Sequence, residues 1–151
     1  MARDTPVGVL RGMELSPESL AVLNELRDLV ADNATKKGFR DKLRQNMTDE
    51  QWNGPLGAMV RAAVMTANQH GETSEFWEAY RAGTLDQPCD KAAKMEAMGL
   101  PALTCGEEEI ADELIRVLDK AQAHKIDVAK AVAVKAAFNS GRPYLHGNKQ
   151  A

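Results

Sequence analysis

Four carboxylates occur in two pairs whose spacing could build a metal site. Glu72 and Glu75 are three residues apart, and Glu109 and Asp112 repeat that spacing later in the chain. If both segments are helical, each pair lies on one side of its helix, one turn apart. Two such helices packed side by side would bring the four carboxylates together, and like charges at close range need cations between them. Oxygen ligands of this kind suit Mg²⁺ or Mn²⁺ better than zinc.

The same acids also fit an ordinary solvated helix surface. After Thr104, apolar residues recur at helical spacing, and Glu109 and Asp112 fall largely opposite them. This apolar stripe comprises Ile110, Leu114, Val117, Leu118 and Ala121. The acids at 107–109 also lie in the first turn of the helix, where negative charge is favourable. Spacing alone therefore leaves both interpretations open.

The elements that must position these acids are helical throughout. Helix starts are indicated by capping residues at Ser16, Thr48, Thr104 and Asp127. Gly38 ends the first helix, Gly83 ends a long second helix over 54–83, and Gly141 with Pro143 ends the last. A connection at 84–105 carries one short helix near 90–98. With strand signals almost absent, we expect an all-α fold with a four-helix core and one longer loop between the second and third main helices.

Composition limits the class of protein. The chain has 151 residues, of which 44% are hydrophobic and 27% charged, as in a globular domain. A net charge of −3 and 5% aromatic residues argue against a nucleic-acid partner. There is no apolar run of about 18 residues and no signal-like N-terminus, so we expect no membrane partner and a cytoplasmic location. The expected divisions are an arm at 1–15, a domain at 16–147 and a tail at 148–151.

Two apolar patterns predict self-association. The apolar face of the second helix moves after Gly71 from one set of positions to Phe76, Trp77 and Tyr80. The last helix is apolar in most directions, so it needs cover on more than one side. A symmetric partner is the natural source of that cover, which predicts a homodimer or homotetramer.

The last helix also carries polar residues within its apolar row. Lys135 and Asn139 are four residues apart and share a sector with Val128 and Val132. A lysine at such a position either extends its ammonium group to solvent or faces an anion. Arg142 follows at the end of the helix.

Together, four ordered segments resemble the MazG-like family of all-α nucleoside triphosphate pyrophosphohydrolases. The family carries E-x-x-E on one helix and E-x-x-D on a later one, and the counterparts here lie in "HGETSE" and "EIAD". "EEEIADELIRVLD" resembles its acidic helix, "KAAFNSGRPYLHG" its closing segment, and "NATKKGF" a stretch near its base-binding pocket. The resemblance runs from about residue 20 to residue 147 and favours the metal-site interpretation. Gly71 departs from it, because the family often has serine there.

The resemblance implies hydrolysis of a nucleoside triphosphate to the monophosphate and pyrophosphate, with Mg²⁺ as cofactor and Mn²⁺ able to substitute. It implies that the metal ligands and catalytic residues are Glu72, Glu75, Glu109 and Asp112, with Lys135 also catalytic. The implied substrate-binding residues are Asn33, Lys36, Phe39, Lys135, Asn139 and Arg142. Deoxynucleotides, with a lean to dGTP or dATP, are expected from short relatives rather than from any residue. The alternatives are a nucleotide-binding regulatory module without turnover and a helical interaction protein.

Overall fold

A computed structural model describes residues 16–140, and every element within that range is a helix. The helices are α1 (Pro17–Lys36), α2 (Phe39–Arg44), α3 (Asp49–Asn53), α4 (Pro55–Ala82), α5 (Ala92–Ala97), α6 (Cys105–Ala123) and α7 (Val128–Ser140). No strand occurs among these residues, so the all-α prediction is confirmed. The arm at 1–15, the stop at Gly141 and Pro143, and the tail at 148–151 lie outside the described residues.

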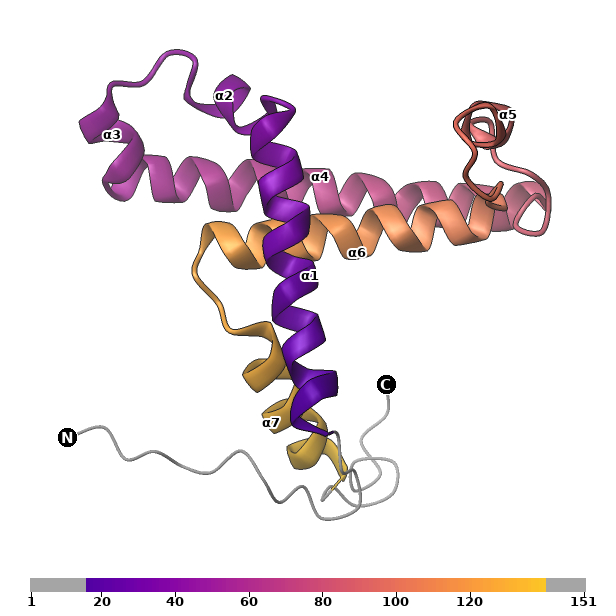
Figure 1. The fold of residues 1–151 in the computed structure, drawn as a ribbon. Coiled ribbons are helices and arrows are strands. Elements are labelled where there is room, and N and C mark those ends of the chain that lie inside the picture. The colour runs from indigo at the N-terminus through magenta and orange to yellow at the C-terminus, as the bar shows by residue number, and fades with distance from the viewer. Residues whose placement is uncertain (1–15, 141–151) are drawn as a thin grey trace.

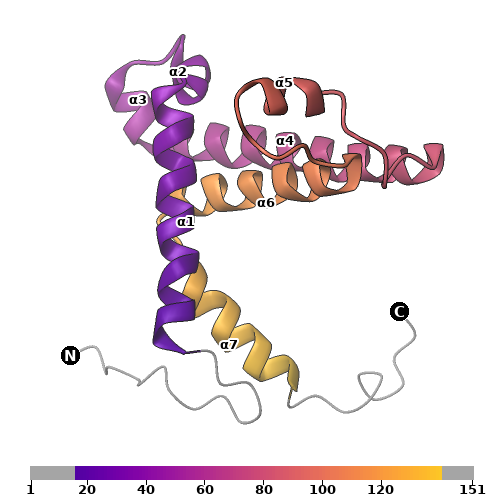
Figure 2. The ribbon, with the colours of Figure 1, turned by 45° about the vertical axis from the view of Figure 1, so that its right-hand side comes forward.

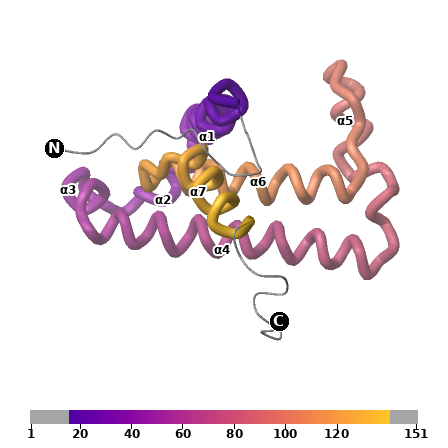
Figure 3. Tube along the Cα trace, turned by 90° about the horizontal axis from the view of Figure 1, so that it is seen from below, coloured from indigo at the N-terminus to yellow at the C-terminus, as the bar shows by residue number. Residues whose placement is uncertain are grey.

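The four long helices form a crossed arrangement rather than a parallel bundle (Figure 1). α4 and α6 lie side by side, and α1 crosses this pair steeply while contacting α6. α7 packs against α1 and runs away from the α4–α6 pair (Figure 2). Seen from below, α5 lies at one end of that pair and α3 at the other (Figure 3). The predicted longer loop between the second and third main helices is the segment from 83 to 104, which carries α5.

The predicted helix ends are present because each is determined by local hydrogen bonds. The Thr104 hydroxyl accepts the amide of Glu107, and the Glu107 carboxylate accepts the amide of Thr104 at 2.8 Å, which completes a capping box at the start of α6. Ser16 caps α1 in the same way through its hydroxyl. α4 ends at Gly83, whose φ of 70° is the left-handed conformation that glycine adopts without strain.

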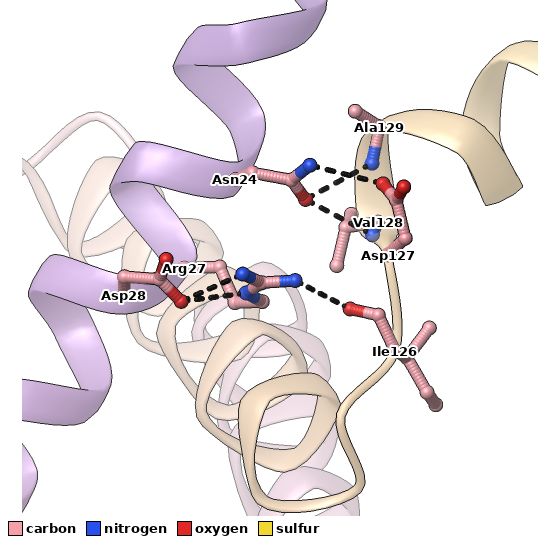
Figure 4. Close-up of polar contacts among 7 residues, drawn as sticks. All are labelled: Asn24, Arg27, Asp28, Ile126, Asp127, Val128 and Ala129. Carbon is pink, nitrogen blue, oxygen red and sulfur yellow. Dashed lines mark hydrogen bonds and ion pairs between the residues drawn. The ribbon is translucent and has the colours of Figure 1, made fainter.

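The start of α7 is held by side chains from α1 (Figure 4). Asn24 Oδ1 accepts the amides of Val128 at 3.2 Å and Ala129 at 3.4 Å, and Asn24 Nδ2 donates to Asp127 Oδ1 at 2.9 Å. Arg27 donates to a carbonyl oxygen of the preceding loop at 2.7 Å. The predicted cap Asp127 also accepts the amide of residue 130 at 3.0 Å. Unpaired amides of the first turn are therefore satisfied across the α1–α7 contact.

The buried apolar core of the described residues is small and rich in alanine. Its members are Ala31, Met65, Cys89, Ala92, Leu118, Ala121, Ala129 and Ala133. Large apolar side chains on every long helix are exposed instead, including Val22, Leu29, Met59, Trp77, Tyr80, Ile110, Val132 and Val134. These side chains are the ones that the expected homodimer or homotetramer would cover.

None of the helices in residues 16–140 combines the length and the apolar character that crossing a bilayer requires.

Two glycines of α4 should respond oppositely to alanine. A Cβ at Gly57 would lie 2.0 Å from the carbonyl oxygen of Trp52, whereas a Cβ at Gly71 meets nothing within 4 Å. Gly57→Ala must shift the backbone between α3 and α4 and should cost about 1–3 kcal/mol. Gly71→Ala should stabilise by about 0.5–1 kcal/mol, because alanine favours the helix. Urea unfolding followed by circular dichroism measures both; equal effects would contradict the described packing.

Candidate metal centre

Polar side chains bridge α4 and α6 at successive turns and fix their antiparallel register. The pairs are Gln69 with Lys120, Glu72 with Arg116 at 2.7 Å, and Thr73 with Glu113 at 2.8 Å. Residue numbers rise along α4 while their partners fall along α6, so the helices run in opposite directions. A shift of one residue would rotate these side chains away from their partners, because successive residues differ by about 100° around a helix.

Three of the predicted ligands meet in this α4–α6 contact. Glu72, Glu75 and Glu109 each offer a carboxylate oxygen, and these oxygens lie within 4.8 Å of one another. Glu72 is only 8% exposed, whereas Glu75 is open to solvent. Asp112 follows Glu109 by one turn and is half-buried. We call Glu72, Glu75, Glu109 and Asp112 the acidic cluster.

The electrostatics of the acidic cluster oppose full ionisation without a cation. Burial raises the pKa of Glu109, and the nearby charge of Glu75 raises it further. Burial likewise raises the pKa of Asp112, and the charge of Glu72 adds to this effect. The positive charge of Lys91 acts in the opposite direction on both. A divalent cation would remove the like-charge repulsion, and all-oxygen donors fit Mg²⁺ or Mn²⁺.

Two cations flank the acidic cluster. Arg116, on α6, donates from Nε to Glu72 Oε1 and holds that carboxylate in one orientation. Lys91 lies in the connection before α5 and forms an ion pair with Glu108, which is buried beside Glu109. The Lys91 side chain is 56% exposed, so its ammonium group also reaches solvent. Each cation compensates part of the negative charge gathered at this contact.

The predicted apolar stripe of α6 is wrong over its first half. Ile110 and Leu114 are 52% and 47% exposed, whereas Glu109 and Asp112 are half-buried. Only the later members, such as Leu118, enter the core of the chain. Periodicity places apolar residues inward by default, but here the seam with α4 is polar. The exposed apolar residues are then left for another contact.

Two of the three predicted base-side residues line a small cavity. Asn33 and Phe39 line it together with Arg116 and residues 30, 34, 115 and 119, and its volume is about 100 Å³. Arg116 thus connects this cavity to Glu72. Ligand pockets usually measure about 300–1,000 Å³, so the cavity can hold only one edge of a nucleotide. Lys36 is not in its lining and forms an ion pair at 2.5 Å with residue 32.

The predicted phosphate-side residues are not brought to the acidic cluster within one chain. Lys135 and Asn139 lie exposed on α7, which packs against α1. The Lys135 ammonium nitrogen lies 5.0 Å from the ring centre of Phe138 and lines a separate hollow of about 530 Å³. Arg142 lies outside the described residues.

Sequence reasoning missed Arg116 and Lys91. Arg116 is four residues after Asp112 and seven after Glu109, so a survey of the acidic face of that helix could have found it. Lys91 lies in a connection, where no periodicity predicts which way a side chain points.

Comparisons with known proteins add no family assignment. No protein-family model, curated protein or solved structure matches the chain.

Removing one charge from the acidic cluster should stabilise the metal-free fold. Because folding raises the pKa of Glu109, ionising this carboxyl group costs more in the folded chain than in the unfolded chain. The free energy of unfolding therefore falls as the pH rises through the folded-state pKa. Glu109→Gln should therefore raise the melting temperature in EDTA at about pH 8, and this gain should shrink towards about pH 5. The variant should also lose most of the stabilisation that MgCl₂ gives the unaltered protein.

Glu96→Gln is the matched control, because Glu96 is exposed on α5 and is not a member of the acidic cluster. This variant should leave the melting temperature unchanged both in EDTA and in MgCl₂. A Glu109→Gln protein that is less stable in EDTA but keeps its full response to MgCl₂ would contradict the account.

Proposed function

We propose that the chain is a Mg²⁺-dependent nucleoside triphosphate pyrophosphohydrolase. The observation that carries the proposal is the convergence of Glu72, Glu75 and Glu109 across the α4–α6 contact, with Asp112 one turn further along. An ordinary solvated helix face would point such acids apart and away from the neighbouring helix. The resemblance of the two acidic segments to the MazG-like family supplies the reaction class.

The chain's own residues would act first by binding. The acidic cluster would hold the divalent ions, and Arg116 would keep the Glu72 carboxylate turned towards them. The bound ions would neutralise the triphosphate, polarise the α-phosphoryl group and lower the pKa of a water molecule that attacks it. Lys91, paired with Glu108 next to the cluster, is 56% exposed and would bind phosphate oxygens with its ammonium group.

The sugar or base would lie towards the Asn33–Phe39 cavity, which Arg116 joins to the acidic cluster. The cavity covers only part of a nucleoside, so further contacts must come from elsewhere. A preference for deoxynucleotides, with a lean to dGTP or dATP, follows from the family resemblance alone.

Assembly would complete the site. Lys135 and Asn139 lie away from the acidic cluster of their own chain, and large apolar side chains on α1, α4, α6 and α7 are exposed. A homodimer or homotetramer would cover those side chains and could bring the α7 cations of one copy towards the carboxylates of another.

The experiment that tests the reaction is a panel of common ribo- and deoxyribonucleoside triphosphates with MgCl₂. Products are scored as monophosphate with pyrophosphate, or as diphosphate with orthophosphate. The proposal expects the first pair, with ¹⁸O from labelled water in the monophosphate. Binding with no product would indicate a nucleotide-binding module, and no response to Mg²⁺ would indicate a helical interaction protein.

Loss of a single ligand charge should abolish turnover without unfolding the chain. Glu75→Gln and Asp112→Asn each remove one charge at nearly constant volume, so each should lower kcat by about 100-fold or more. Glu96→Gln, on the exposed side of α5, should retain the unaltered rate. Circular dichroism checks the helix content. Near-normal rates in both ligand variants would show that other groups carry the reaction.

The mass in solution tests assembly. Multi-angle light scattering at micromolar concentration should report two or four times the chain mass of 16.5 kDa. The physical reason is the exposed apolar surface, which water disfavours. A stable and fully active monomer would contradict the prediction.

A further inference from the structure

A second hollow lies at the other end of the α4–α6 pair. It is formed by α2, α3, the start of α4 and the end of α6, and its volume is about 450 Å³. That volume lies within the usual range of small-molecule sites. The charged and aromatic residues that line it are Arg40, Arg44, Arg61, Lys125, Asp41 and Trp52. We call it the basic hollow.

The basic hollow is separate from the acidic cluster of the same chain. Arg61 precedes Glu72 by 11 positions on α4, which corresponds to about 16 Å along a helix axis. On α6, the lining residue Gln122 follows Glu109 by 13 positions, or about 20 Å. One phosphate group therefore cannot contact both regions of the same chain at once.

Positive charge exceeds negative charge in the lining of the basic hollow. Arg40 is paired with Asp119 at 2.6 Å, and Arg44 is paired with Asp49. Arg61 and Lys125 form no ion pair with any of the described residues. Asp41, the one acid among the described residues of the lining, offsets one of these two charges, so the lining keeps an excess of positive charge that attracts an anion.

Arg40 and Lys125 of the basic hollow are each fixed in place by local structure. Arg40 Nε is buried and has no hydrogen-bond partner among the described residues. That nitrogen is closed to solvent, and the terminal nitrogen of Arg40 is held by Asp119 at 2.6 Å, so Arg40 shapes the hollow without offering this donor to a ligand. Lys125 has a φ of 56°, and no other residue except glycine has a positive φ in the described part of the chain. This left-handed residue ends α6, because the Lys125 amide donates to the Gln122 carbonyl oxygen and the next amide along the chain donates to the Ala121 carbonyl oxygen, both at 2.9 Å.

Arg61 is positioned by Trp52. Its guanidinium carbon lies 4.6 Å from the centre of the Trp52 ring, and it donates from one terminal nitrogen to the Trp52 carbonyl oxygen at 2.7 Å. These contacts reduce the freedom that the side chain would lose on binding a ligand. A planar guanidinium held in this way suits the oxygens of a phosphate group.

We propose that the basic hollow is a binding site for a small molecule bearing a phosphate chain, distinct from the acidic cluster. Arg61 and Lys125 would contact the phosphate oxygens. The source can be an inorganic polyphosphate or a nucleoside di- or triphosphate, since both carry the recognised group. The site does not depend on the proposed hydrolase activity.

The test is isothermal titration calorimetry of the full chain, freed of metal on a chelating resin. Without cations the acidic cluster repels polyanions, so binding under these conditions reports on the basic hollow. The probes are inorganic tripolyphosphate and ADP at low salt. We expect the unaltered chain to bind at least one of them, more weakly as salt is raised. Stronger binding of ADP assigns the site to nucleotides, and stronger binding of tripolyphosphate assigns it to the phosphate chain alone.

Two variants connect that binding to the basic hollow. Arg61→Gln and Lys125→Gly should each weaken it by about tenfold or more, because each removes a charge-assisted contact. Lys125→Gly also relieves the positive φ, so loss of the fold cannot account for its effect. The control is Arg81→Gln with Lys94→Gln, two exposed cations outside the lining.

The control variant should bind within about twofold of the unaltered chain, since charges this far away are largely screened. An RNA oligonucleotide serves as a third probe. The proposal would be overturned if neither tripolyphosphate nor ADP binds, if both single variants keep the binding, or if only the RNA binds.

Discussion

Repulsion between like-charged carboxylates is the main constraint that the α4–α6 contact has to overcome. Three carboxylate oxygens from the two helices lie within 4.8 Å of one another, and burial together with the charge of Glu75 raises the pKa of Glu109. The helices nevertheless remain paired, because polar bridges link them at successive turns and Arg116 neutralises the most buried member, Glu72. The raised pKa values of Glu109 and Asp112 show a local electrostatic cost in the described fold. Such costs are concentrated at functional sites.

The rest of the frame keeps this contact aligned with little apolar burial. Alanines at the α1 and α7 contacts allow close approach of backbones, and Asn24 joins the two helices through hydrogen bonds rather than through large side chains. The α4–α6 pair extends beyond α1 on either side. The acidic cluster lies towards the end that carries α5, and the basic hollow lies at the other end. Opposite charge is therefore distributed to opposite ends of one helical pair. Large apolar side chains on all four long helices remain exposed in the single chain.

The helix ends could be predicted from sequence because they depend on local chemistry. Thr104, Asp127 and Gly83 act on backbone groups within a few residues, and each does so in the structure. The pairing of Glu72 and Glu75 with Glu109 could be proposed from spacing, but only the family resemblance favoured it over a solvated surface. The orientation of Ile110 was predicted wrongly, because periodicity assumes that the apolar side of a helix faces its nearest neighbour. Lys91 could not be predicted, since its position depends on how a connection folds against α6.

The central proposal is that the acidic cluster binds a divalent metal ion. The most direct measurement is a crystal structure of the chain soaked with MnCl₂, with data collected to locate manganese by its anomalous scattering. The account predicts manganese bound by Glu72, Glu75, Glu109 and Asp112, with Arg116 still donating to Glu72. A cluster without manganese at saturating concentration, or manganese bound only elsewhere on the surface, would contradict it.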